Sequence, residues 1–210
     1  MKSLFDLCEP RDSIFDASKR DTVLNLSHLI SEKIDAKSFF DENYVTGGMA
    51  VLLKESFRRL QGKTDQAVFK LTQAMGGGKT HNLITLGLLA KHPAFRPQVL
   101  AGLPDGKALP EVRVVAFSGR ETDVPHGIWG EIANQVGKAE IFSEYYSPLK
   151  APGRTAWTKL LKGPPTLILL DELPPYLDNA KSISVGNSDL AKVTATALTL
   201  ASDSPVVAMS

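Results

Sequence analysis

The stretch AVFKLTQAMGGGKTHNLITLGLLA, from Ala67 to Ala90, constrains the fold of this chain more than any other. It joins an apolar run to three consecutive glycines, and a long apolar segment follows Lys79 and Thr80. Each glycine inside a regular helix or strand would cost roughly 0.5 to 1 kcal/mol relative to alanine, so the run marks an unusual backbone. The pattern predicts a strand over Ala67–Leu71, a glycine loop, and a buried helix that begins near Lys79.

The glycine loop has the chemistry of a phosphate-binding site. Glycine permits φ > 0, so successive N–H groups can turn inward and form an anion-binding nest. A helix start adds free N–H groups and about half a positive charge. We expect Lys79 to reach the β- and γ-phosphates and the Thr80 hydroxyl to bind Mg²⁺. The residues expected to bind the nucleotide are Met75, Gly76, Gly77, Gly78, Lys79, Thr80 and His81.

Two observations bear on how specific this motif is. The pattern departs from G-x-x-x-x-G-K-[ST] at Gln73, where the first glycine would stand. A second G-K-T tripeptide, Gly62–Thr64, follows a polar segment rather than an apolar strand, and Asp65 and Gln66 come after it. We interpret that tripeptide as incidental. The alternative for Gly76–Thr80, a flexible surface turn with an incidental lysine, is disfavoured by the strand and helix around it.

A second candidate element ends in two acids. Thr166–Leu170 is a nearly continuous aliphatic run, typical of a strand buried on both faces, and Asp171 and Glu172 follow it. Carboxylates at the end of a buried strand require a cation or hydrogen-bond donors. We expect Asp171 to bind Mg²⁺ or its water, and Glu172 to polarise an attacking water as a general base, with Glu172 and Lys79 as the catalytic residues. The alternative is a strand end that reaches solvent.

The remaining chain predicts further helices and strands of a mixed α/β fold. A helix over Gly47–Leu60 is expected, with Thr46 as its N-cap and Val51, Leu52, Phe57 and Leu60 on one face. Other expected elements are a strand over Val112–Phe117, a helix over Ile128–Val136 with Trp129 in the packing, an irregular Glu140–Pro152, a kinked loop at Leu173–Tyr176, a helix capped by Asn187 or Ser188, and a strand over Pro205–Met209.

Composition narrows the class of protein. The 210 residues suit one large domain or a core with a small extension, and we place the boundary after residue 42. The 43% hydrophobic and 22% charged content is average, and no apolar run could span a bilayer. A net charge of +1 gives no overall footprint for nucleic acid. Cys8 is the only cysteine, and the N-terminus lacks the apolar core of a signal peptide, so a cytoplasmic protein without a membrane partner is expected.

Three segments together resemble a known family. They are QAMGGGKTH at Gln73–His81, HGIWGEIA at His126–Ala133 and TLILLDELPPYL at Thr166–Leu177, and FFDENYVTGGMAVLL is similar to the family's lead-in. From about Phe39 onward the chain resembles the AAA-like P-loop ATPases of the domain-of-unknown-function family numbered four hundred ninety-nine. Genes of that family often accompany DNA methylases and helicases in anti-phage defence islands.

The resemblance implies a P-loop NTPase fold, a three-layer α/β/α sandwich with a mostly parallel sheet, AAA-like and truncated. It implies that the Pro205 strand lies between the phosphate strand and the Asp171 strand, and that residues 43–210 form an incomplete ATPase core with Walker A and Walker B motifs. Family members are longer, so a fifth strand, a lid, a sensor arginine and an arginine finger are expected beyond Ser210. Without the fifth strand, the phosphate strand is expected to be an exposed sheet edge.

Three functional hypotheses follow. The first is a module that binds ATP with Mg²⁺ and hydrolyses it at the β–γ bond, within a nucleic-acid-directed defence system. The alternative is a nucleotide-dependent regulatory or assembly module with little or no hydrolysis. A small-molecule phosphotransferase is less well supported, because no acceptor pocket is recognisable. Expected partners are ATP, further copies of the chain or a larger defence complex, and DNA indirectly. We also expect slow or absent hydrolysis without the missing parts.

Overall fold

A four-stranded parallel sheet forms the centre of the protein. The computed structural model describes residues 24–72, 76–120, 124–201 and 206–209. The strands are β1 (Val68–Lys70), β2 (Arg113–Ser118), β3 (Thr166–Asp171) and β6 (Val206–Met209), in the order β1-β6-β3-β2. The strand predicted near Pro205 is β6, and it lies between β1 and β3, which confirms the predicted strand order.

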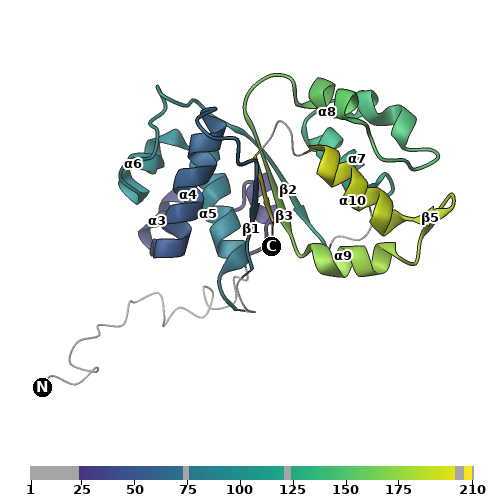
Figure 1. The fold of residues 1–210 in the computed structure, drawn as a ribbon. Helices are drawn as coiled ribbons and strands as arrows, with labels where there is room; N and C mark the ends of the chain where they lie inside the picture. Colours follow the sequence, from purple (N-terminus) through teal and green to yellow (C-terminus); the bar gives the residue numbers. More distant parts are fainter. Residues whose placement is uncertain (1–23, 73–75, 121–123, 202–205, 210) are drawn as a thin grey trace, which may run out of the picture.

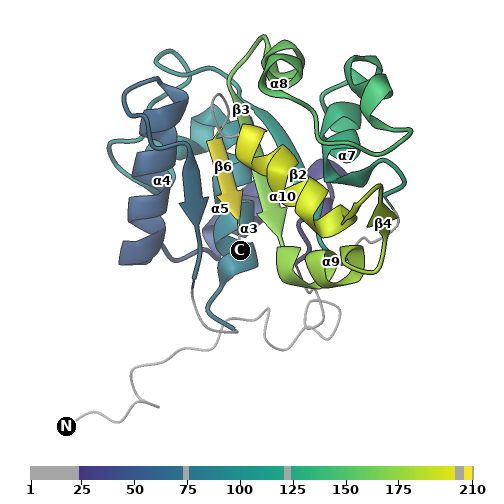
Figure 2. The ribbon, with the colours of Figure 1, turned by 45° about the vertical axis from the view of Figure 1, so that its right-hand side comes forward.

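Helices cover both faces of this sheet, as Figures 1 and 2 show. One face carries α2 (Ser27–Ile30), α3 (Ala36–Asp41), α4 (Gly47–Leu60), α5 (Lys79–Lys91), the 3₁₀ turn Pro93–Phe95 and α6 (Arg96–Val99). The other carries α7 (Gly127–Gln135), the 3₁₀ helix Ala139–Tyr145, α8 (Arg154–Leu161), α9 (Leu173–Ala180) and α10 (Leu190–Ala201). A small antiparallel hairpin, β4 (Ser184–Val185) with β5 (Ser188–Asp189), precedes α10. The protein is thus a mixed α/β structure with a parallel sheet.

Strand β3 divides the hydrophobic core into two clusters. All six of its residues are buried, which confirms the prediction of a strand covered on both faces. Leu167 and Leu169 pack in the cluster on the α5 face, and Ile168 and Leu170 pack in the cluster on the opposite face. Because side chains alternate along a strand, Asp171 falls on the same side as Leu167 and Leu169. The end of β3 therefore directs Asp171 toward α5.

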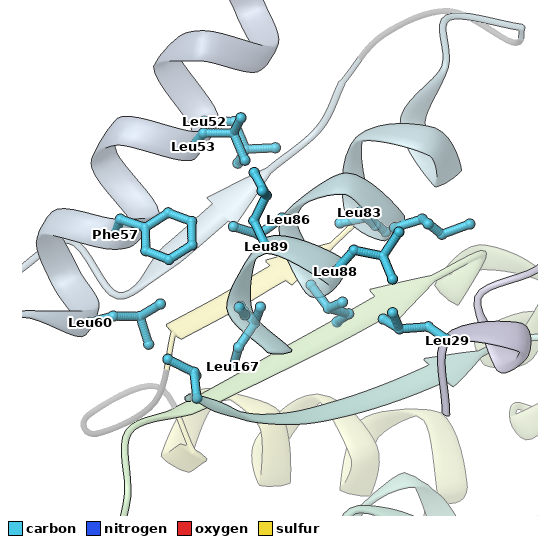
Figure 3. Packing of buried hydrophobic residues seen from close by; sticks show 14 of the residues in the cluster. Leu29, Leu52, Leu53, Phe57, Leu60, Leu83, Leu86, Leu88, Leu89 and Leu167 are labelled. Atoms are coloured by element: carbon cyan, nitrogen blue, oxygen red, sulfur yellow. The ribbon is translucent and has the colours of Figure 1, made fainter. Parts of the chain in front are cut away.

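Helix α5 is buried almost all round. Every residue from Asn82 to Ala90 is buried, and Figure 3 shows its leucines between α4 and the sheet. Burial of one such aliphatic side chain contributes about 1.5 to 3 kcal/mol relative to an exposed position. The helix that carries Lys79 and Thr80 is therefore firmly fixed against β3.

Helix α4 begins and ends at the predicted residues. The Thr46 hydroxyl accepts a hydrogen bond from the Met49 N–H at 3.2 Å, which confirms the predicted N-cap. The predicted apolar face is wrong at Val51, which is 63% exposed. Leu53 is buried in that layer instead, because it points toward α5 (Figure 3).

Two predicted chain breaks differ from the structure. The predicted loop at Leu173–Tyr176 is wrong, because Pro174 and Pro175 stand in the first turn of α9. N–H groups in a first turn have no partner within the helix, so proline is tolerated there. The cap predicted at Asn187 or Ser188 is also wrong. Asp189 Oδ1 accepts the Lys192 N–H at 2.9 Å, because the earlier residues form the β4–β5 hairpin.

Strand β1 is an edge of the sheet within the described residues. It is shorter than predicted and pairs with β6 alone in that part of the chain, which agrees with the expected exposed edge. Phe69 is buried, whereas Val68 and Lys70 are exposed. Ser210, which follows β6, lies outside the described residues.

The segment that precedes α4 packs into the same core. Leu26, Leu29 and Phe39 are buried in the cluster that contains α5. Residues on both sides of position 42 therefore pack in one hydrophobic cluster. Trp129 is completely buried on the other face, which confirms its predicted place in the packing. Among the helices of the described ranges, none combines the length and the apolar content that a bilayer crossing requires.

Candidate functional site

The glycine loop adopts a backbone that side chains disfavour. Gly76 has φ of 77° and Gly78 has φ of 73°, both in the left-handed region, and Gly78 is the N-cap residue of α5. Apart from its chain neighbours, no described residue has an atom within 4 Å of the position that a Cβ would take at either glycine. Glycine is therefore required here by conformation, and the space next to the loop is open to a ligand. Met75 and Gln73 lie outside the described residues.

A hydrogen bond joins the start of α5 to the end of β3. The Thr80 hydroxyl donates to Asp171 Oδ2 at 2.6 Å, between residues 91 positions apart in the chain. Asp171 is only 4% exposed, and its other oxygen, Oδ1, accepts the Glu172 N–H at 3.0 Å. The structure thus brings together the two residues that the sequence predicted as Mg²⁺ ligands.

The backbone turns away from the direction of β3 at Glu172. Its φ of 53° is unusual for a residue with a side chain, and it is the N-cap residue of α9. Its carboxylate forms an ion pair with Arg120, between Oε2 and Nε. The two acids therefore have separate partners, Thr80 for Asp171 and Arg120 for Glu172.

Arg120 is the site residue that the sequence analysis missed. It follows β2, between the strand predicted over Val112–Phe117 and the helix predicted over Ile128–Val136, where no site residue was predicted. The signal that could have found it is register, because Ser118 at the end of β2 pairs with Asp171 at the end of β3. A residue just beyond Ser118 therefore lies beside Glu172.

Gly119 permits this close approach. Its N–H donates to the Asp171 carbonyl at 2.8 Å, and a Cβ on Gly119 would stand 1.9 Å from the Glu172 carbonyl oxygen. Real side chains do not fit at that distance, so glycine alone lets the two strand ends lie this close. The contact places Arg120 next to the Glu172 carboxylate.

His81 lies in the first turn of α5, and its ring is held by residues that precede α4. His81 Nε2 and Asn43 Oδ1 are 2.6 Å apart, and the ring stacks on Phe39 with centroids 4.8 Å apart. Burial lowers the pKa of His81. The ring therefore fixes the start of α5 against the segment around Asn43.

The lowered pKa of His81 predicts a loss of stability on acidification. Unfolded histidine titrates near about 6.5, so between that pH and the lowered folded value the unfolded chain binds more protons. The contribution of His81 to the free energy of unfolding is complete above about pH 6.5. It is lost as the pH falls toward the pKa of His81 in the folded state. Thermal unfolding between pH 7 and 5 should show a shallower pH dependence for His81→Gln than for the wild type. Identical slopes would contradict the assignment.

These residues line one cleft of about 720 Å³, which we name the phosphate cleft after the ligand that the sequence predicts for its glycine loop. Its lining residues are Leu24, Gly76, Gly77, Gly78, Lys79, Thr80, His81, Arg120, Asp171, Glu172, Pro174 and Pro175. Lys79 and Asp171, predicted to share a ligand, lie on the same cleft. Within the described ranges, no group of three or more His, Cys, Asp and Glu side chains is arranged to hold a metal ion.

The fold and this cleft define a class of protein: a parallel α/β protein in which a glycine loop and a helix start face an acidic strand end. Residues 11–103 match the family model of the DUF499 N-terminal domain, which confirms the predicted family over that part of the chain. The match begins well before Phe39, so it includes residues that the sequence motifs had not connected with the family. No curated protein and no solved structure matches the chain.

Proposed function

We propose that this protein binds ATP together with Mg²⁺ in the phosphate cleft, as a P-loop NTPase with an AAA-like three-layer architecture. The observation that carries the proposal is the 2.6 Å hydrogen bond between the Thr80 hydroxyl and Asp171. It joins a glycine loop and helix start to the acidic end of a neighbouring buried strand. The combination of anion donors and oxygen ligands in one cleft is the chemistry that a magnesium–triphosphate complex requires.

The residues present suit the phosphate groups of a nucleotide. Gly76 and Gly78 have positive φ and open space where a Cβ would stand, so main-chain N–H groups can approach a ligand closely. The start of α5 adds its macrodipole, and Lys79 on the same cleft supplies a full positive charge. These donors favour a polyanion over a neutral ligand.

The oxygen donors also suit magnesium. Mg²⁺ is usually held in proteins by one or two carboxylates with substrate phosphates and water, and the Thr80 hydroxyl and the Asp171 carboxylate are hard oxygen ligands of this type. When bound, Mg²⁺ would supply charge neutralisation for the phosphate oxygens. Thr80 and Asp171 would hold it.

The proposed reaction is hydrolysis at the β–γ bond. A water oxygen forms a bond to the γ-phosphorus, the bond from that phosphorus to the bridging oxygen breaks, and ADP and phosphate leave. Glu172 accepts the proton that the water gives up, as a general base. Its carboxylate lies on the same cleft as Lys79 and Thr80, which supports this role.

A second candidate function is a nucleotide-dependent regulatory module with little hydrolysis. The ion pair between Glu172 and Arg120 favours it, because Arg120 occupies the Glu172 carboxylate oxygen that an attacking water would need to contact. A role in an anti-phage defence system and an indirect DNA partner stay predictions from the family resemblance.

Calorimetric titration with ATP and Mg²⁺ tests the binding proposal. Lys79→Ala should weaken ATP binding roughly 10- to 100-fold, because a hydrogen bond to a charged group contributes about 1.5 to 3 kcal/mol. Lys63→Ala is the matched control, since Lys63 is exposed and belongs to the other G-K-T tripeptide, which follows α4. It should bind ATP as the wild type does.

Two results would contradict the proposal. One is a wild-type protein that binds no ATP in the presence of Mg²⁺. The other is an equal loss of affinity in the Lys63 and Lys79 variants, which would indicate a general charge effect.

A further inference from the structure

Arg120 is a cationic residue that lines the phosphate cleft beside the two acids. Its side chain is 72% exposed, and it lines the cleft with Lys79, Thr80 and Glu172. A guanidinium has five N–H donors in a planar fork. Its contact with the Glu172 carboxylate is made through Nε, and the two terminal nitrogens stand farther out along the side chain.

The ion pair with Glu172 is weak enough to exchange. Glu172 is only 29% exposed, but Arg120 is 72% exposed, so water screens the guanidinium side of the pair. Ion pairs that water screens contribute about 0.2 to 1 kcal/mol. A phosphate group offers more negative charge and a geometry that a guanidinium can bind with two parallel hydrogen bonds. A terminal phosphate in the cleft would therefore compete with Glu172 for Arg120.

The backbone around Arg120 limits where the guanidinium can go. The Gly119 N–H is bound to the Asp171 carbonyl, and Gly119 lies against the Glu172 carbonyl. Arg120 is thus held at the same strand ends that present Asp171 and Glu172. Its side chain extends from this fixed backbone into the cleft that the glycine loop also lines.

We infer that Arg120 distinguishes a nucleoside triphosphate from a diphosphate by exchanging the Glu172 carboxylate for the terminal phosphate. The inference rests on the proposed nucleotide binding, and it assigns to Arg120 the recognition of the third phosphate. Release of Glu172 in the same exchange leaves its carboxylate available to water. A diphosphate has no terminal third phosphate to compete with Glu172 for Arg120. The Arg120–Glu172 ion pair is therefore retained when a diphosphate is bound.

Calorimetric titrations with ADP and with an ATP analogue whose β–γ bridge is a methylene group test this inference, both with Mg²⁺. Arg120→Gln should weaken the triphosphate analogue about 10-fold and change ADP affinity less than about 2-fold, since one charge-assisted contact is lost and a weak ion pair is no longer broken. Retained ADP binding shows that this exposed variant is folded. Arg58→Gln, at an exposed Arg58–Glu55 pair on α4, is the matched control and should change neither.

Glu172→Gln gives an effect of opposite sign. Arg120 then has no carboxylate to leave, so the triphosphate analogue should bind about 2- to 5-fold more tightly, while ADP affinity stays the same. In the double variant, which combines Arg120→Gln with Glu172→Gln, this gain in affinity for the triphosphate analogue should be absent.

The outcomes separate this inference from the proposed function. A wild-type protein that binds neither nucleotide overturns the proposed function and the inference with it. A different result overturns only the role of Arg120. In that case the wild type binds both nucleotides, and Arg120→Gln either weakens ADP and the triphosphate analogue equally or weakens neither.

Discussion

Glu172→Gln is expected to lower steady-state ATP turnover by at least about 100-fold while ATP binding is retained. General bases typically contribute about 10²- to 10⁴-fold, and glutamine cannot accept the proton of the attacking water. The change keeps the size of the side chain, and Glu172 lies at the start of α9 on the phosphate cleft, so the fold should be preserved. Phosphate release measured with saturating ATP and Mg²⁺ is the readout.

Glu144→Gln is the control for this prediction. Glu144 is an exposed glutamate whose partner is Lys150, away from the phosphate cleft, and its replacement should leave turnover unchanged. Turnover at the wild-type rate in Glu172→Gln would contradict the general-base role. Slow wild-type turnover that Glu172→Gln does not reduce further would favour the regulatory module, and it agrees with the hypothesis that this chain hydrolyses ATP slowly by itself.

Arg96→Met is expected to lower the free energy of unfolding by about 3 kcal/mol or more. Arg96 is completely buried, and its guanidinium donates to the carbonyl oxygens of Leu89 at 2.7 Å and Ala90 at 2.9 Å, at the end of α5. Further donors reach the carbonyls of Pro104, Leu109 and Pro110. Methionine fills similar space but leaves several of these oxygens without a donor, at about 1 to 3 kcal/mol each.

Thermal unfolding measures this effect. For a domain of this size, a loss of about 3 kcal/mol corresponds to a decrease in Tm of roughly 6 to 12 °C. Arg58→Met is the matched control, because Arg58 forms an exposed pair with Glu55 and should change the free energy of unfolding by less than about 0.5 kcal/mol. Arg96→Lys should also be destabilised, since one ammonium group cannot reach all the carbonyls. Equal Tm values for Arg96→Met and Arg58→Met would contradict the assignment.

Arg96 also shows how the two ends of α5 differ. The glycine loop at its start is open and lies on the phosphate cleft, whereas its end is fixed by Arg96, which stacks 4.9 Å above the Phe57 ring of α4. A loss of Arg96 would therefore loosen the helix that carries Lys79 and Thr80. Reduced ATP affinity in Arg96 variants is expected only near their lowered Tm.

Local patterns were sufficient for much of the fold. The Thr46 cap and the helix over Gly47–Leu60 follow from neighbouring residues, and so does the buried run Thr166–Leu170. The predictions failed where a neighbour in space decided the outcome. Val51 lies on the apolar stripe of the sequence, but it faces solvent because no element covers that side of α4 in the described part of the chain.

The sequence by itself determined the glycine loop, the acid pair and the strand that carries it, because backbone preference and side-chain alternation act over a few residues. Only the tertiary structure decided that Arg120 pairs with Glu172, that Asn43 holds His81, and that Arg96 is buried. Each of these contacts depends on strand register or helix packing between distant segments, and a charged or polar side chain gives no local sign of the partner that will satisfy it.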